Sequence, residues 1–257
     1  MLQHPERYQQ VRITWRQDFS HDLWSIRVAP EQPLGFKPGQ YATLGVEHED
    51  KVIERAYSIV SSPLEPEIEF FFELVPQGAL TPKLYPLGVG DTMLMRKQSK
   101  GLFTLDAKTG HKKHFLVSTV TGVAPFVSMA RTLSREVQAG AGTDHLLVCL
   151  QAASYPHEFA YREELEDAAG RHPSWFKYVP TVSRPWEAPE WKGEIGRAED
   201  LLRAYTHRLG LTHGDTTAYL CGHPGMIENG KGILKRAGFT KESIKEEIYW
   251  IPAKGAE

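Results

Sequence analysis

The stretch Arg55-Ala56-Tyr57-Ser58 lies between a run of short alternating strands and the rest of the chain. It combines a cationic fork, a flat aromatic ring and a small hydroxyl at the end of an expected strand. Side chains alternate between the faces of a strand, so Arg55 and Tyr57 are predicted on one face and Ser58 on the other. This combination suits a flat, phosphorylated ligand. A salt bridge and an amphipathic packing residue are the alternative interpretation.

The chain up to about residue 105 has apolar residues at every second position, as strands do. These residues are Val11, Ile13 and Trp15, then Trp24, Ile26 and Val28, then Ala42, Leu44 and Val46, then Ile68, Phe70, Phe72 and Leu74, and finally Met93 and Met95. Turn-forming clusters separate the runs, for example at Pro38-Gly39 and Ser62-Pro63. Residues 1–106 are therefore expected to form a small antiparallel β-barrel.

Strand and helix patterns alternate after Lys108-Thr109-Gly110. Strands are expected at 115–118, 146–150, 178–182 and 218–221, and helices around 126–137, 159–169 and 199–205, with a further helix after Cys221. The strand Leu146 to Leu150 is continuously apolar, as a parallel strand buried on both faces should be. Residues 107–257 are therefore expected to form an α/β domain with a parallel sheet.

The composition is that of a globular protein, with 257 residues, 41% hydrophobic content and 24% charged residues. A net charge of -2 gives no overall reason to propose nucleic acid. The first ten residues lack the apolar run of a signal peptide, and no segment is long enough to cross a bilayer, so a cytoplasmic protein is expected. Its two cysteines, Cys149 and Cys221, are too few for an iron-sulfur cluster, which needs about four thiolates.

Two turns in the sequence could bind phosphate. Thr81-Pro82 is a favourable helix start, and free N–H groups there would face a phosphate. A capped surface helix without a ligand is the alternative. The stretch Ser118 to Phe126 joins the first strand of the α/β half to its first helix, where open α/β sheets bind nucleotide pyrophosphate. Val120 stands in this turn, where a more flexible residue would be easier to accommodate.

Two further stretches lie late in the chain. Cys221-Gly222-His223-Pro224-Gly225-Met226 ends a strand and opens a helix. No second ligand pair lies nearby with suitable spacing, so no metal site is expected. Glu247-Ile248-Tyr249-Trp250 combines a carboxylate with two large aromatic residues, which would pack in a core or cover a flat cofactor.

Six motifs, in this order, resemble the ferredoxin-NADP(+) reductase family and particularly its bacterial branch. They are Pro38-Gly39-Gln40-Tyr41, Arg55-Ala56-Tyr57-Ser58, Gly78 to Leu84, Thr119 to Phe126, Cys221-Gly222-x-Pro224 and Glu247-x-Tyr249-Trp250. The resemblance covers nearly the whole chain. It implies an FAD-binding barrel, a Rossmann-like domain for NADP, and hydride transfer in the cleft between them.

The resemblance also implies roles for single residues. In the Arg55-Ala56-Tyr57-Ser58 motif, Arg55 would pair with the FAD pyrophosphate, helped by Thr81, while Tyr57 would stack on the flavin and Ser58 would lie near its N5. Tyr249, with Trp250 beside it, would shield the other flavin face. Thr121, Gly122 and Pro125 would form the turn for the pyrophosphate of NADP, and Cys221 and Glu247 would lie beside the nicotinamide. Ser58, Cys221, Glu247 and Tyr249 are thereby the predicted catalytic residues.

Preference for NADP rests on Ser183, Arg184 and Arg197, which match positions that the family uses for the 2′-phosphate. The chain departs from the family at three places. Ser154 stands where members of the bacterial branch often have a further arginine, and Val120 stands at a position that is usually glycine. The seven residues after Trp250 make the ending longer than this motif usually has.

By resemblance, the protein would be a monomeric enzyme that exchanges hydride with NADP(H) and single electrons with a separate ferredoxin or flavodoxin. Six lysines are candidates for contact with an acidic carrier: Lys97, Lys100, Lys112, Lys113, Lys231 and Lys235. The alternatives are an oxygenase reductase component, a reductase of free flavin, or a non-catalytic module that senses flavin or nucleotide.

Overall fold

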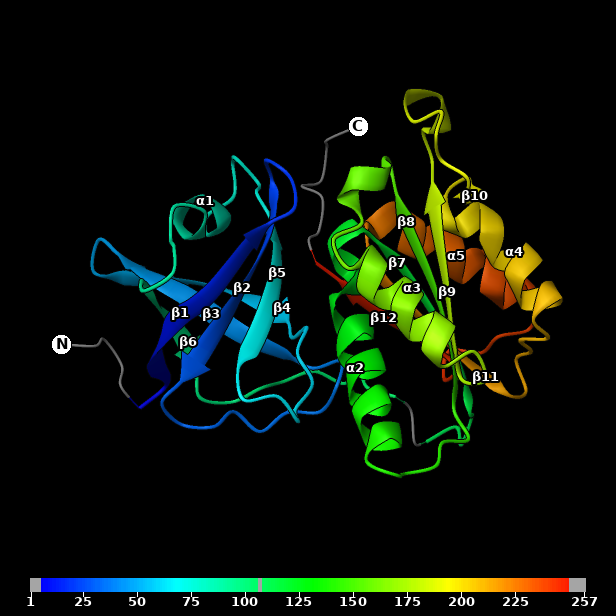
Figure 1. The fold of residues 1–257 in the computed structure, drawn as a ribbon, viewed down its shortest axis with the longest axis horizontal. Helices are drawn as coiled ribbons and strands as arrows, with labels where there is room; N and C mark the ends of the chain where they lie inside the picture. The colour runs from blue at the N-terminus through cyan, green and yellow to red at the C-terminus, as the bar shows by residue number, and fades with distance from the viewer. Residues whose placement is uncertain (1–5, 106–107, 250–257) are drawn as a thin grey trace.

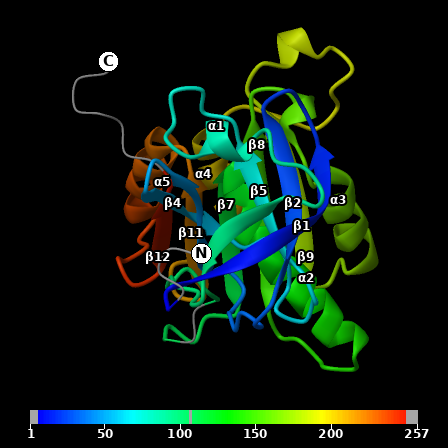
Figure 2. The same ribbon diagram turned by 90° about the vertical axis from the view of Figure 1, so that its left-hand side faces the viewer.

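The computed structural model describes residues 6–105 and 108–249. Its strands form two sheets of six strands each, one antiparallel and one parallel, which lie side by side (Figure 1). Turning the molecule by 90° brings the antiparallel sheet in front of the parallel one (Figure 2). The predicted combination of a β-barrel with an α/β domain is confirmed.

The antiparallel sheet has the strand order β4-β3-β6-β1-β2-β5. Its elements are β1 (Tyr8–Asp18), β2 (Leu23–Pro30), β3 (Tyr41–His48), β4 (Lys51–Ser58), β5 (Ile68–Glu73), the short helix α1 (Thr81–Leu84) and β6 (Thr92–Arg96). The outer strands meet just beyond β4, where Ile59 pairs with Phe70 and the Val60 N–H donates to the Glu69 carbonyl (2.9 Å). This contact closes the sheet into a barrel.

Strand β5 is buried on both of its faces. Every second residue faces the barrel core and pairs with an apolar residue of β2: Phe72 with Trp24, Phe70 with Ile26, and Ile68 with Val28. Phe71 points the other way and packs into the core of the α/β half. Glu69 lies on that same outer face and is only 1% exposed. The run Ile-Glu-Phe-Phe-Phe therefore forms the strand where the two halves meet.

The parallel sheet has the strand order β10-β9-β8-β7-β11-β12. Its strands are β7 (Lys113–Thr119), β8 (Leu146–Ala153), β9 (Phe176–Val182), β10 (Glu194–Ile195), β11 (Thr216–Gly222) and β12 (Ile244–Ile248). The helices are α2 (Ala124–Gln138), α3 (Arg162–Arg171), α4 (Ala198–Arg208) and α5 (Pro224–Arg236), with short 3-10 helices η1 (Val120–Val123), η2 (Pro156–Glu158) and η3 (Pro185–Glu187). Helices α2 and α3 cover one face and α4 and α5 the other (Figure 1).

The central strands are apolar on both faces along most of their length. In β7, Leu116 packs with residues of α2 and α3, while Phe115 and Val117 pack with residues of α4 and α5. Because helices cover both faces of the sheet, the side chains in the middle of β7 are apolar on both faces, and the buried polar residues His114 and Ser118 lie near its ends.

Two edge strands differ from the sequence-based expectation. Strand β10 has two residues, and β12 carries the polar sequence Ile-Lys-Glu-Glu-Ile, which has no clear apolar alternation. Strand β12 pairs with β11 and places Glu247 opposite Cys221. Within the described residues, no helix is long and apolar enough to span a bilayer.

Candidate active-site cleft

A cleft of about 1500 Å³ lies between the barrel and the carboxyl edge of the parallel sheet. Most predicted site residues line it: Arg55, Ala56, Tyr57, Ser58, Thr81, Thr121, Ser183, Arg184, Arg197, Glu247 and Tyr249. Gly122, Pro125 and Cys221 are buried beside the cleft and do not line it. Trp250 lies outside the described residues. The structure therefore gathers at one place motifs that are far apart in the sequence.

The last four residues of β4 all border the cleft. Strand β4 stands at the end of the strand order of the antiparallel sheet and pairs along its length with β3. Side chains from both of its faces line the cleft. The predicted placement of Ser58 on a different face from Arg55 and Tyr57 thus does not separate it from the cleft. The Arg55 side chain is exposed and donates from Nη1 to the Glu54 carbonyl (2.8 Å).

Tyr57 forms part of the wall of the cleft. Its ring packs edge-on against Phe72 of the barrel core, with 4.7 Å between ring centroids. Burial raises the pKa of Tyr57 to about 12, although the charge of Arg55 opposes the shift. Tyr57 therefore stays a neutral phenol and offers a flat aromatic surface.

Thr81 is the first residue of α1, as the sequence predicts for a helix start. Its hydroxyl accepts a hydrogen bond from the Val75 backbone N–H (3.0 Å) and does not cap its own helix. A helix of four residues has little macrodipole. The hydroxyl also donates to the Val75 carbonyl (3.4 Å), so this loop offers a phosphate mainly its backbone N–H groups.

Ser58, Glu247 and Tyr249 form one hydrogen-bonded cluster across the cleft. The Ser58 hydroxyl donates to Glu247 Oε1 (3.0 Å), and the Tyr249 hydroxyl donates to Ser58 Oγ (3.1 Å). Burial raises the pKa of Glu247 from 4.5 to about 7, although the hydrogen bond from Ser58 opposes this shift. Glu247 can therefore gain or lose a proton near neutral pH, while Ser58 links the two domains.

Cys221 lies behind this cluster and is fully buried. Burial, together with the nearby Glu247 carboxylate, raises the pKa of its thiol well above the usual value. The Tyr249 hydroxyl contacts the thiol, so Tyr249 stands between Cys221 and the cleft. Burial likewise raises the pKa of Tyr249, whose hydroxyl is enclosed although 37% of the residue is exposed. Cys221 is thus a neutral thiol, and its predicted place beside a nicotinamide requires Tyr249 to move.

Two residues, Val120 and Gly122, have unusual backbone positions in the turn between β7 and α2. Val120 has a φ of 39°, in the left-handed region that glycine adopts without strain. A Cβ on Gly122 would lie 2.3 Å from the Cys221 carbonyl oxygen, so only glycine fits there. The turn therefore keeps a glycine-type backbone conformation at Val120, although the residue is β-branched.

We expect the substitution Val120→Gly to change the free energy of unfolding by less than about 1 kcal/mol. Relief of backbone strain, of order 1–3 kcal/mol, offsets the greater chain entropy of glycine and the lost packing of the half-buried valine side chain. Urea unfolding of both proteins measures the change. Val89→Gly is the control, since Val89 is an exposed valine at an ordinary φ. Equal destabilisation by both substitutions would contradict the strain at Val120.

A contact that no sequence motif predicted joins two turns under the cleft. Thr119 ends β7, and its hydroxyl accepts a hydrogen bond from the His223 backbone N–H (2.8 Å). A Cβ on Gly222 would lie 2.3 Å from the Thr119 hydroxyl oxygen, and Gly222 has a φ of 119°. The sequence could have revealed this contact through the positions of Thr119 and His223, because both lie where a parallel strand ends at the same edge of the sheet.

Ser183, Arg184 and Arg197 lie together along the nucleotide half of the cleft. Arg184 donates from Nη1 to the Tyr155 hydroxyl (2.5 Å), and its guanidinium lies 5.3 Å from the centre of that ring. Trp186, which sequence analysis did not single out, lines the same region and is 73% exposed. Its signal in the sequence is an aromatic residue in a short loop directly after Arg184.

These side chains fit the two cofactors that the resemblance implies. FAD and a pyridine dinucleotide each carry a pyrophosphate and flat rings. The cleft has arginines from both halves of the chain, namely Arg55, Arg184 and Arg197, and the aromatic rings of Tyr57 and Tyr249. Cationic donors match the phosphates and aromatic rings match the flavin and adenine.

Comparisons with known proteins identify similar domains and similar whole chains. Residues 10–104 match the family model of the oxidoreductase FAD-binding domain, and residues 116–231 match that of the oxidoreductase NAD-binding domain. The chain is 30% identical over 226 residues to a flavodoxin/ferredoxin-NADP reductase of Shigella flexneri, covering 85% of this chain and 86% of that protein. It is 28% identical over 258 residues to the reductase component of a phenol 2-monooxygenase from Pseudomonas, covering 99% of this chain and 69% of that protein.

Among solved structures, a ferredoxin NADP+ reductase from Neisseria gonorrhoeae with bound FAD and NADP has a similar fold. It superposes with a TM-score of 0.82 at 23% identity, covering 95% of this chain and 99% of that one. With both domain matches, the relative at 30% identity and this shared fold, the chain belongs to the ferredoxin-NADP(+) reductase family of FAD-binding and pyridine nucleotide-binding oxidoreductases.

Proposed function

We propose that this protein is a ferredoxin- or flavodoxin-NADP(+) reductase, which exchanges hydride with NADP(H) and single electrons with a small carrier protein. The observation that carries the proposal is the cluster of Ser58, Glu247 and Tyr249, which joins both domains inside one cleft. When bound, FAD would supply the chemistry that converts a two-electron hydride into single electrons. The side chains bind and orient the rings, which is the main contribution of the protein.

In this proposal the barrel side of the cleft binds FAD and the α/β side binds NADP. Arg55 and the Thr81 loop bind the FAD pyrophosphate, and Tyr57 and Tyr249 enclose the flavin ring. The Thr119–Ala124 turn binds the pyrophosphate of NADP. Tyr249 must leave its contact with Cys221 before a nicotinamide can lie beside the thiol, and Glu247 holds a proton near that point.

We assign the 2′-phosphate of NADP to Ser183, Arg184 and Arg197. The double substitution Arg184→Ala with Arg197→Ala is expected to raise the KM for NADPH about tenfold and to leave the KM for NADH nearly unchanged, since charge-assisted bonds to a phosphate are lost. Steady-state kinetics with both nucleotides measures this. Arg203→Ala is the control, because Arg203 is an exposed arginine on α4 away from the cleft. An equal rise for both nucleotides would remove the assignment.

A separate protein is the proposed electron acceptor. The chain has two cysteines, both buried and free, which are fewer than the four or so thiolates of an iron-sulfur cluster. Of the candidate lysines, Lys112 and Lys113 lie at the amino end of β7, opposite the cleft, and pair with Asp144 and Asp215. Lys231 pairs with two glutamates. These three are therefore poor candidates for the carrier surface, and Lys97, Lys100 and Lys235 remain.

The second candidate is a reductase component of an oxygenase, because the relative from the phenol 2-monooxygenase matches 99% of this chain. That match covers 69% of the relative, compared with 86% for the Shigella reductase. The more complete match supports the ferredoxin or flavodoxin reductase.

We place the FAD domain in residues 1–106 and the nucleotide domain in residues 107–257, since β6 ends at Arg96 and β7 begins at Lys113. The free thiols support a cytoplasmic location.

The decisive experiment is turnover with purified carriers. The purified protein should be yellow, and anaerobic NADPH should bleach it within a turnover time. Reduction of cytochrome c should then depend on added ferredoxin or flavodoxin. Reduction that needs only free FMN would support a free-flavin reductase, and flavin that NADPH does not bleach would support a sensing module.

A further inference from the structure

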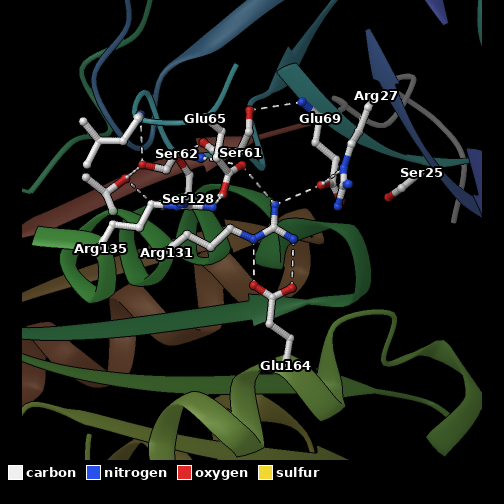
Figure 3. A network of polar contacts seen from close by, with 12 residues as sticks. Ser25, Arg27, Ser61, Ser62, Glu65, Glu69, Ser128, Arg131, Arg135 and Glu164 are labelled. Carbon is white, nitrogen blue, oxygen red and sulfur yellow. Dashed lines mark hydrogen bonds and ion pairs between the residues drawn. The ribbon is translucent and has the colours of Figure 1, made fainter. Parts of the chain in front are cut away.

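A second polar network lies between the barrel and the α/β half (Figure 3). It contains three arginines and three glutamates, which balance in charge: Arg27, Arg131, Arg135, Glu65, Glu69 and Glu164. None of them lines the cleft. The network therefore serves something other than direct contact with a ligand in the cleft.

Glu69 is the centre of this network and is 1% exposed. Its Oε2 accepts hydrogen bonds from Arg27 Nε (3.0 Å) and Arg131 Nη1 (2.9 Å), and its Oε1 accepts one from the buried Tyr161 hydroxyl (2.8 Å). Burial acts to raise the pKa of Glu69, but Arg131 and these other partners outweigh it and lower the pKa. Glu69 is thus an ionised carboxylate held from β2, from α2 and from the residue that precedes α3.

Arg131 of α2 connects the barrel to α3. Its Nε and Nη2 form a bidentate pair with Glu164 of α3 (2.6 and 2.8 Å), while Nη1 reaches Glu69 of β5. Its side chain is 13% exposed. An arginine can bridge two carboxylates in this way because its planar guanidinium carries donors on several nitrogens. The single ammonium group of a lysine cannot do the same.

The same face of α2 makes two further contacts with the barrel. Ser128 donates to the Ser61 carbonyl (2.7 Å), and Thr132 donates to the Ser62 hydroxyl (2.9 Å). Residues 128, 131, 132 and 135 follow the spacing of one helical face, so successive turns of α2 are held along the barrel. Helix α2 runs along the junction of the two sheets in Figure 1.

The barrel segment after β4 and helix α2, which this network joins, both lead directly into the cleft. Ser61 and Ser62 follow Ser58 in the same chain segment, and the Val60 N–H donates to the Glu69 carbonyl (2.9 Å). Helix α2 begins at Ala124, which lines the cleft immediately after the nucleotide turn. The network thus holds the segment that carries Ser58 against the helix that carries the nucleotide turn.

We propose that Arg131 and Glu69 are positioning residues, which set the separation of the two domains so that Ser58 meets Glu247 and Tyr249 across the cleft. For hydride transfer, this inference rests on the function proposed above. A reaction that needs rings in close contact is sensitive to small displacements, and a misplacement of about 1 Å can cost about 100-fold in rate.

Spin-label distances test the domain separation. Labels are attached to Arg12→Cys on β1 and Arg203→Cys on α4, which are exposed positions away from the cleft, while the two native cysteines are buried. The distance distribution of the FAD-loaded protein is measured with Arg131, with Arg131→Gln and with Arg131→Lys. Arg171→Gln is the matched control, since the side chain of Arg171 is 53% exposed and pairs with Asp167 of its own helix α3.

We expect Arg131→Gln to broaden the distance distribution at least about twofold and to lower the limiting rate of flavin bleaching by NADPH about tenfold, with little change in the NADPH concentration for half-saturation. Arg131→Lys should give intermediate values, and Arg171→Gln should match the parent protein. An unchanged distribution and rate in Arg131→Gln would overturn the inference. If that variant does not fold, an unchanged Arg131→Lys would do so. A parent protein that NADPH does not bleach would refute the proposed function, while the distances would still decide the positioning role.

Discussion

Replacing Arg55 by Ala is expected to raise the dissociation constant for FAD about 100-fold. Arg55 is exposed at the edge of the cleft, and within residues 6–105 and 108–249 no carboxylate lies at ion-pair distance from it. Its guanidinium is thus available for a phosphate. A charge-assisted hydrogen bond contributes about 1.5–3 kcal/mol, and 1.4 kcal/mol corresponds to a factor of about ten.

Titration of the apoprotein with FAD, followed by flavin fluorescence, measures the change. Arg12→Ala is the matched control, because Arg12 is an exposed arginine of the same barrel that does not line the cleft. Arg55→Lys should fall between the parent and Arg55→Ala, since it keeps the charge but loses the fork. Equal affinities for Arg55→Ala and Arg12→Ala would show that Arg55 does not bind the pyrophosphate.

The second large effect concerns the pH dependence of stability and its origin in Glu247. Burial raises the pKa of this carboxyl from 4.5 to about 7 in the folded protein. Between these values the folded state binds more protons than the unfolded state, so the free energy of unfolding falls as the pH rises. Below about pH 4.5 the stabilising contribution is fully present, and above about pH 7 it is lost. With about 1.4 kcal/mol for each pKa unit, the full contribution is about 3–4 kcal/mol, and about 2–3 kcal/mol of it is lost between about pH 5 and pH 8.

Glu247→Gln removes this titration and leaves a side chain of the same shape. Urea unfolding of the FAD-loaded parent and variant at about pH 5 and pH 8 should show their stability difference changing by about 2–3 kcal/mol in favour of the variant at the higher pH. Glu246→Gln is the control, as Glu246 is the more exposed neighbour on the same strand. A pH-independent difference for Glu247→Gln would contradict the raised pKa.

Local patterns predicted most of the architecture. The period of two before residue 105 and the alternation of strands and helices after it correspond to the two sheets that the structure contains. Strand β12 escaped prediction because its polar sequence carries no alternation, and it forms only because β11 offers a free edge to pair with. Edge strands depend on their neighbour more than on their own residues.

For the site, the motifs pointed to residues that mostly line one cleft, but not to how these residues interact. Ser58 and Glu247 are 189 residues apart, and no spacing rule joins a barrel strand to the last strand of another domain. Val120 was recognisable in the sequence as an unusual residue in a glycine turn. Its left-handed backbone became known only from the fold, which holds the turn by packing Gly122 against the backbone of Cys221.

The sequence by itself determined the two kinds of sheet, their order along the chain and the chemical types of group at the cleft, because hydrophobic periodicity and turn residues are local properties. Only the tertiary structure decided that Glu69 and Arg131 hold the domains together, that Tyr249 covers Cys221 and that Glu247 titrates near neutral pH. These properties depend on burial and on partners from distant segments. Both arise only when the two domains pack against each other.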